Sequence, residues 1–160
     1  LILTRSGGDV PTRPIYISAN TLLPLKQQGS FFPRHTGGSA PDQRLGSSVA
    51  IAADGNTVIT GAPRDSTNRG RVYVYTRVDT AWSNTPTQLF STNYSGATEA
   101  GRQGSSVALL ADGYIAAVGG NTDSVYNTTF IDRGGRGAVW IWARGANDSW
   151  TQQTKIVPIG

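Results

Sequence analysis

The sequence predicts an all-β fold that is built from a repeated, four-stranded antiparallel unit. The stretch RLGSSVAIAADG at 44–55 returns as RQGSSVALLADG at 102–113, with 9 of 12 positions identical. The stretch GRVYVY at 70–75 returns as GAVWIW at 137–142, so the second copy carries 9 extra residues between its two ends. Within each copy, apolar residues follow the alternation of strands and never the 3.6-residue period of a helix.

The first half of each unit is predicted to be a β-hairpin. Residues 48–52 are small and apolar and end at Asp54-Gly55, a dipeptide that tolerates the positive φ angles of a tight turn. The return strand is expected at 57–62, because Pro63 has no N–H with which to continue the ladder.

The second half of each unit supplies two more strands. After a polar loop at 64–70, residues 72–75 alternate β-branched and aromatic side chains, which suits a half-buried pleated surface. A further strand is expected after Trp82, at 88–90. Four short strands that recur about every 58 residues are typical of a β-propeller blade.

The innermost strands of the two units are predicted at 47–53 and 105–111. A glycine precedes each of them, Gly46 in the first copy and Gly104 in the second. We expect these glycines to let neighbouring backbones approach closely, since glycine has no side chain to keep them apart.

These residues resemble the FG-GAP repeat of integrin-α-type β-propellers over roughly residues 44–158. Leu45-Gly46 stands where the family has Phe-Gly, and Gly61-Ala62-Pro63 is the Gly-Ala-Pro motif itself. The second copy is looser, with Gln103-Gly104 and Gly119-Gly120-Asn121 at these places. The resemblance implies a non-enzymatic adhesion or ligand-binding propeller. Kelch-type propellers are the competing fold, through Gly119-Gly120 followed by Trp150-Thr151, and the Gly-Ala-Pro motif favours FG-GAP.

The chain departs from the family at the connection between the first two strands. Calcium-binding repeats have an Asp- and Asn-rich loop there, because Ca²⁺ needs six to eight oxygen ligands. This chain has only Ala53–Asn56 and Ala111–Tyr114, with one carboxylate in each, at Asp54 and Asp112. We therefore predict hairpin turns at both places, and no metal or other cofactor.

Three parts are predicted along the chain. Residues 1–43 form a strand-like segment in which the part from Lys26 supplies the outer strand of the first blade. Residues 1–20 are the tail of a preceding blade, or alternatively a strand donated to the open edge of a neighbouring subunit. Residues 44–101 are the first repeat. Residues 102–160 are the second, with a loop insertion at 121–135 and the start of a further blade at 155–158. A propeller has four to eight blades, so we expect a larger protein or several chains to complete the ring.

Binding is predicted in the blade loops, chiefly 64–70 and the insertion, because long loops on rigid scaffolds carry most binding sites. The alternative is that the insertion is a surface loop without a ligand. The candidate contact residues are Arg64, Asp65, Tyr126, Phe130 and Asp132.

Three Asn-X-Ser/Thr sequons lie in predicted loops, and they begin at Asn93, Asn127 and Asn147. Together with the resemblance, they lead us to expect N-linked glycans and a secreted or cell-surface location.

Composition excludes several classes. Among 160 residues there is no cysteine for a disulfide framework and no apolar run of membrane-spanning length. The net charge of +4 comes from dispersed arginines, whereas a nucleic-acid surface clusters its basic residues with aromatic ones. His35 is the single histidine and Glu99 the single glutamate, so neither a zinc site nor a carboxylate pair is convincing, and we predict no enzyme.

Three functions remain open at this point. The first is an extracellular module that binds a protein or glycan ligand. The second is a structural glycoprotein of a surface fibre or cell-wall assembly, in which copies of the chain pair through their strands. The third is a non-catalytic part of a propeller enzyme.

Overall fold

The computed structural model describes residues 42–91, 101–123 and 135–158. The chain divides into two compact units, Leu1–Ser30 and Phe31–Gly160, and every described residue belongs to the second. The predictions for residues 1–41 therefore lie outside the described part. Within that part, no helix is long and apolar enough to cross a membrane.

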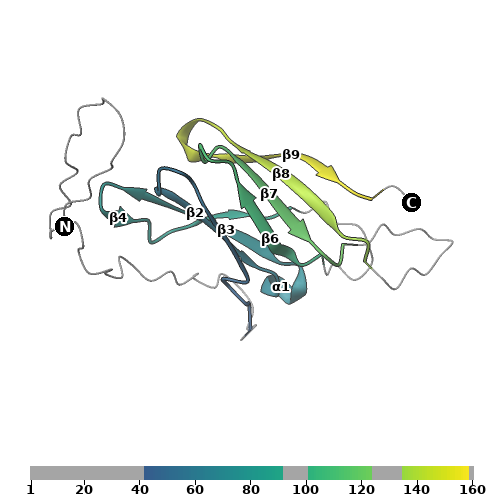
Figure 1. The fold of residues 1–160 in the computed structure, drawn as a ribbon. Coiled ribbons are helices and arrows are strands. Elements are labelled where there is room, and N and C mark those ends of the chain that lie inside the picture. The colour runs from purple at the N-terminus through teal and green to yellow at the C-terminus, as the bar shows by residue number, and fades with distance from the viewer. Residues whose placement is uncertain (1–41, 92–100, 124–134, 159–160) are drawn as a thin grey trace, which may run out of the picture. The chain divides into compact units, whose positions relative to one another are not determined.

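Each repeat forms one antiparallel sheet (Figure 1). The strands of the first sheet are β1 (Ser48–Ile51), β2 (Thr57–Ala62), β3 (Arg71–Val78), β4 (Ala81–Trp82) and β5 (Thr87–Leu89). The strands of the second are β6 (Gln103–Leu109), β7 (Ile115–Gly120), β8 (Ala138–Arg144) and β9 (Trp150–Ile156). The all-β prediction is confirmed for the described residues, and neither sheet closes on itself.

Among the described residues, two short helical turns interrupt the strands, α1 (Asp65–Asn68) and η2 (Ala146–Asp148). The polar loop predicted at 64–70 contains α1, which is a single irregular turn because Ser66 and Thr67 take φ angles of 51° and 59°. A turn this short leaves no periodic signal in the sequence.

The repeat is preserved in the strand register. Ser48 pairs with Gly61 in the first sheet, and Ser106 pairs with Gly119 in the second, a shift of 58 residues on both strands. Val72 pairs with Leu89, and Val139 with Ile156, a shift of 67 on both. The nine additional residues therefore lie between β7 and β8, as the sequence predicts.

The same register corrects the prediction for residues 155–158. Lys155 and Ile156 do not open a further blade; they end β9, the fourth strand of the second sheet. They stand at the positions of Gln88 and Leu89 in β5. The prediction is wrong because an alternating polar strand such as β9 looks the same whether it closes one unit or opens the next.

The two sheets stack face to face around a shared apolar core. From the first sheet, Ile59, Val72, Val74 and Leu89 are at most 2% exposed. From the second, the core takes Ala116, Val118, Ala138, Trp140 and Trp142. Val107 and Leu109 of β6 pack against this cluster and are partly buried. Stacking in this way leaves the other face of the second sheet, with Val139 and Ile156, available for further contacts.

The alternation along β3 puts its two residue types on opposite faces. Val72 and Val74 point into the core between the sheets, whereas Tyr73 and Tyr75 join Ala62 in a second buried cluster. Because successive side chains of a strand point to opposite faces, the Val-Tyr-Val-Tyr pattern requires that both faces of the first sheet be covered.

Candidate functional site

The loop at 64–70 is organised by a buried carboxylate. Asp65 is 5% exposed, and it accepts a hydrogen bond from the hydroxyl of Tyr73 on β3. Its other oxygen lies 3.7 Å from Nε of Arg71. The carbonyl of Asp65 also accepts a hydrogen bond from the N–H of Gly70 at 3.0 Å, which closes the loop. Asp65 therefore holds the loop to the sheet.

This environment changes the acidity of the tyrosine. Burial raises the pKa of Tyr73 well above its ordinary value of 10.0, and the hydrogen bond to Asp65 and the negative charge of that carboxylate raise it further. Burial also raises the pKa of Tyr75. Both phenols are thus held in the neutral form, and Tyr73 acts as a hydrogen-bond donor.

Arg64 is the solvent-facing member of the predicted pair. Its Nη1 lies 2.8 Å from Oδ2 of Asp42, and the guanidinium of Arg44 lies 3.4 Å from the same oxygen. All three side chains are at least 39% exposed. Such an exposed ion pair contributes little to stability, so Arg64 is available to an anionic ligand.

The other predicted ligand contacts, Tyr126, Phe130 and Asp132, lie outside the described residues, as do the sequon residues Asn93 and Asn127. Asn147 is described: it is exposed in η2 with a φ of 58°. The hydroxyl of Ser149, the third residue of that sequon, donates to the carbonyl of Ala146 at 2.9 Å. The Asn147 side chain is therefore accessible to a modifying enzyme.

An ion pair that sequence reasoning missed lies at the base of the insertion. Lys155 Nζ lies 2.5 Å from Oδ2 of Asp123, and the two side chains are 8% and 1% exposed. The lysine also lies over the ring of Trp140, 5.3 Å from its centre. The signal was present in the sequence, because a lysine at an inward-facing position of a strand requires a partner.

The two Asp-Gly turns behave as predicted. Asp54 Oδ1 accepts a hydrogen bond from the N–H of Asn56 at 2.9 Å, and Asp112 Oδ1 accepts one from Tyr114 at the same distance. Each carboxylate therefore serves its own turn. Across 42–91, 101–123 and 135–158, no three His, Cys, Asp or Glu side chains gather into a group that fits a metal ion.

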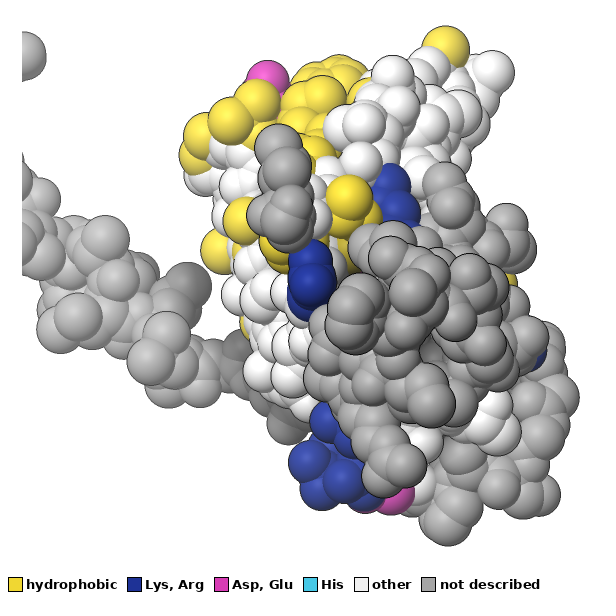
Figure 2. Space-filling view, turned by 90° about the vertical axis from the view of Figure 1, so that its right-hand side faces the viewer, with side chains coloured by type: hydrophobic (Ala, Val, Ile, Leu, Met, Phe, Trp, Pro, Cys, Tyr) yellow, Lys and Arg dark blue, Asp and Glu magenta, His cyan; other side chains and the backbone are white. Residues whose placement is uncertain are grey.

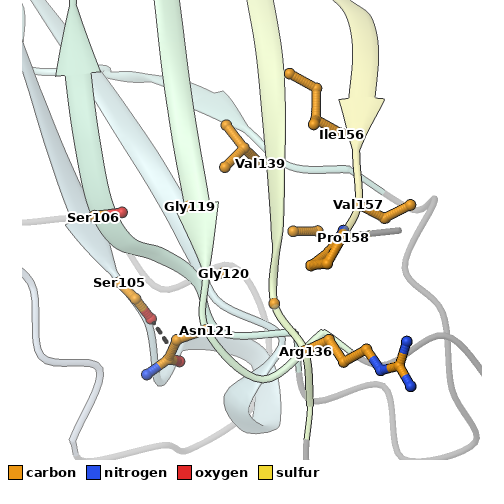
Figure 3. A pocket seen from close by; sticks show the side chains of 12 residues that line it. Ser105, Ser106, Gly119, Gly120, Asn121, Arg136, Val139, Ile156, Val157 and Pro158 are labelled. Carbon is orange, nitrogen blue, oxygen red and sulfur yellow. Dashed lines mark hydrogen bonds between the residues drawn. The ribbon is translucent and has the colours of Figure 1, made fainter. Parts of the chain in front are cut away.

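An open groove of about 600 Å³ lies on the outer face of the second sheet. Figure 3 shows Val139 and Ile156 toward one end of the groove, and Ser105 hydrogen-bonded to Asn121 at the other, with a distance of 3.1 Å. Gly119 and Gly120 form part of its wall. Sequence analysis predicted no groove here, since it depends on which face of the sheet is left uncovered.

The second sheet also exposes apolar side chains outside the groove. The exposed large hydrophobic residues of the second sheet and its turns are Leu110, Tyr114, Ile115, Val139, Ile156 and Val157. Figure 2 likewise shows hydrophobic side chains gathered in one area of the surface. Exposed apolar area of this kind is typical of an interaction surface.

The fold and these surfaces define a repeat-built, stacked β-sheet protein with loops and an apolar face open to contact. No protein-family model matches the chain, and no curated protein is significantly similar to it in sequence.

Proposed function

We propose that the chain is a non-enzymatic, extracellular β-propeller module of the FG-GAP type that binds a protein or glycan ligand through its blade loops. Each sheet is one blade, and the insertion at 121–135 together with the loop at 64–70 makes the ligand contact.

The observation that carries this proposal is that β2 and β3 of the first sheet pair in the same register as β7 and β8 of the second. Because β2 and β3 pair as β7 and β8 do, the connections at 64–70 and 121–137 leave equivalent ends of equivalent strands. Loops that leave the same edge of a rigid stack form a composite surface, which is how repeat proteins usually bind.

The chemistry of the loops supports a polar ligand. Arg64 is exposed and paired only with an exposed carboxylate, so it can exchange that partner for an anionic group at little cost. Asp65 is held by Tyr73 and Arg71, and this fixes the backbone beside Arg64. A fixed backbone lowers the entropy lost on binding.

The test is a binding survey with a matched aromatic control. The labelled full chain is applied to a glycan array and to purified extracellular-matrix proteins, and hits are quantified by surface plasmon resonance. Tyr126→Ala and Phe130→Ala should each weaken binding by about tenfold or more, as aromatic interface residues commonly do. Tyr114→Ala is the control, because Tyr114 is an exposed aromatic in the turn at the opposite end of the strands.

Absence of binding to every member of the survey would contradict the proposal. So would a ligand whose affinity falls equally with Tyr114→Ala, because contact would then lie away from the loops.

The structural role is the second candidate, and the exposed apolar face of the second sheet favours it. A subunit of a fibre must carry surfaces through which copies join, and a monomeric binding module has no need of such a face.

A further inference from the structure

The groove on the second sheet corresponds to a site on the first sheet, and the backbone around Gly104 occupies that site. The bulged start of β6, around Gly104, is seated against Gly61 of the first sheet, and Ser48 Oγ donates a hydrogen bond to the carbonyl of Gly104 at 2.9 Å. A methyl group placed on Gly61 would overlap that carbonyl oxygen. A second contact forms at the other end of the strands, where the N–H of Ala53 donates to the carbonyl of Ala111 at 2.8 Å.

The second sheet has an equivalent site, and none of the described residues occupies it. Ser106 and Gly119 stand at the positions of Ser48 and Gly61, in the same register. The three atoms nearest to a methyl group on Gly119 would all belong to Ser106 of the same sheet. The groove on the second sheet therefore has the same shape as the site on the first sheet that the backbone around Gly104 occupies. We call this groove the socket.

The apolar wall of the socket is also preserved and uncovered. Ile156 corresponds to Leu89, and Val139 corresponds to Val72. Leu89 and Val72 are 1% and 0% exposed beneath the second sheet, whereas Ile156 and Val139 are 54% and 37% exposed. These side chains are of the core type and are fully buried where a neighbouring sheet covers them.

The chain also carries a second turn of the shape that fits the socket. Arg44 and Gly46 have φ angles of 54° and 89°, against 48° and 86° for Arg102 and Gly104. Ser47 Oγ bonds the carbonyl of Arg44 at 2.7 Å, and Ser105 Oγ bonds that of Arg102 at the same distance. A methyl group on Gly46 would meet nothing within 4 Å, so this turn is not seated against a neighbouring sheet.

The strand after this turn, β1, is also exposed, whereas Tyr73 and Tyr75 of β3 on the same face of the sheet are buried. Val49 and Ile51 of β1 are 60% and 59% exposed, while their counterparts Val107 and Leu109 pack against the core between the sheets. Residues 44–51 thus form a plug with the geometry and the apolar side chains of the segment 102–109.

The free surfaces differ from the internal contact at one pair of positions, and both members of the pair change together. In the filled seat, the buried amide of Gln103 accepts from the N–H of Ser91 at 3.0 Å and donates to its carbonyl at 2.8 Å. In the free plug the counterpart of Gln103 is Leu45, and in the free socket the counterpart of Ser91 is Pro158. A proline has no N–H to satisfy and a leucine offers no amide, so the polar pair is replaced on both sides at once.

We infer from these matched positions that two copies of this chain join head to tail, with the plug of one copy, residues 44–51, seated in the socket on the second sheet of the next. The interface repeats the internal stacking. The Ser106 hydroxyl of one copy donates to the Gly46 carbonyl of the next, and the Ala111 N–H donates to the Ala53 carbonyl. Leu45 lies against Pro158, and Val49 and Ile51 cover the apolar wall. Because plug and socket are different surfaces, the association is heterologous and extends beyond a dimer.

The experiment measures the mass of the full chain by multi-angle light scattering across a concentration series. The wild-type mass should rise through multiples of 16.9 kDa and at least double between the lowest and highest concentration. Val49→Glu blocks the plug and Ile156→Glu blocks the socket, so each variant alone should keep the mass of one chain. Val78→Glu is the matched control, since Val78 is 73% exposed at the end of β3, and it should behave as wild type.

The decisive experiment mixes the two glutamate variants. Val49→Glu retains a socket and Ile156→Glu retains a plug, so an equimolar mixture should form a particle of two chains and grow no further. A wild-type chain that stays at the mass of one chain at every concentration would overturn the inference. A mixture that stays monomeric, or variants that still polymerise alone, would also overturn it.

A crosslink provides a readout that does not depend on the glutamate variants. The chain has no cysteine, so Leu45→Cys combined with Pro158→Cys places one thiol in each half of the interface. Oxidation should give a ladder of covalent multimers on a denaturing gel, and either single variant should give dimers at most. The pair Leu45→Cys and Val78→Cys should give no ladder, and an equal ladder from both pairs would overturn the inference.

Discussion

The backbones of Gly61 and Gly104 touch where the two sheets stack. A Cβ atom added to Gly104 would lie 2.9 Å from the Cα of Gly61 and 2.6 Å from the carbonyl oxygen of Arg71. Both separations are far shorter than an ordinary carbon contact, so the sheets approach through glycine on both sides. The close approach that the sequence predicts is thus confirmed at Gly104. At Gly46, the equivalent position, no neighbouring backbone lies within 4 Å of such an atom.

Gly104→Ala should destabilise the fold by about 3 kcal/mol or more, because the methyl group forces two backbones apart in addition to straining a positive φ. Gly46→Ala is the matched control, since its φ of 89° is nearly that of Gly104 and its surroundings are empty. It should cost only about 1 kcal/mol from φ strain. Urea unfolding of both variants measures the difference, and equal losses would show that the sheets do not meet at Gly104.

Stability should fall in alkali, and Tyr73 should account for part of the loss. Its pKa is raised in the folded chain, so its contribution is complete below about pH 10, where the unfolded chain titrates, and is lost as the pH rises from there toward the folded value. Tyr73→Phe should reduce that alkaline slope by up to about 1.4 kcal/mol per pH unit. Tyr75, whose pKa is also raised, keeps part of the slope.

The same substitution should cost about 1 to 3 kcal/mol at pH 7, because it leaves the buried carboxylate of Asp65 without its phenol donor. Urea midpoints between pH 7 and pH 11 measure both effects, and Tyr114→Phe at an exposed position is the control. An unchanged slope in Tyr73→Phe would contradict the assignment.

Breaking the ion pair between Asp123 and Lys155 should cost about 3 to 5 kcal/mol, because either single change removes the opposite charge at 2.5 Å from a buried charged group. Asp123→Asn and Lys155→Met should both show this loss in chemical unfolding, and the double variant should recover a large part of it. The exposed pair Asp42 and Arg64 is the control, since Arg64→Met should cost less than about 1 kcal/mol. Additive losses in the double variant would mean that the two residues do not form a pair.

Expression in a glycosylating secretory host should attach an N-linked glycan at Asn147, because the sequon is exposed. Intact mass before and after enzymatic glycan removal measures occupancy of that site in a chain whose other two sequons are removed. Ser149→Thr preserves the sequon and should keep the glycan, whereas Ser149→Ala should lose it. A chain that is secreted in full with Asn147 unmodified would count against the extracellular proposal at this site.

Repeat, register and turns were accessible from sequence because each has a local or periodic signature. Asp54-Gly55 and Asp112-Gly113 predict hairpin turns. The difference in length between the two repeats locates the insertion. The end of the chain was misread, because the alternation in β9 does not reveal which neighbour a strand pairs with. The buried network of Asp65 and the groove also went unpredicted. Both depend on which surfaces of the sheets are covered, and that is decided by packing between residues far apart in sequence.

The stacking of the two repeats is the central claim, and nuclear Overhauser contacts between the α protons of Gly61 and Gly104 test it most directly. Isotope-labelled protein with selective glycine labelling gives these signals without overlap from other residue types. The account predicts a strong contact between the two glycines, accompanied by slow exchange of the Ala53 amide that bonds Ala111. No contact between the glycines, together with a fast-exchanging Ala53 amide, would mean that the two sheets do not stack and that neither the blade nor the socket exists as described.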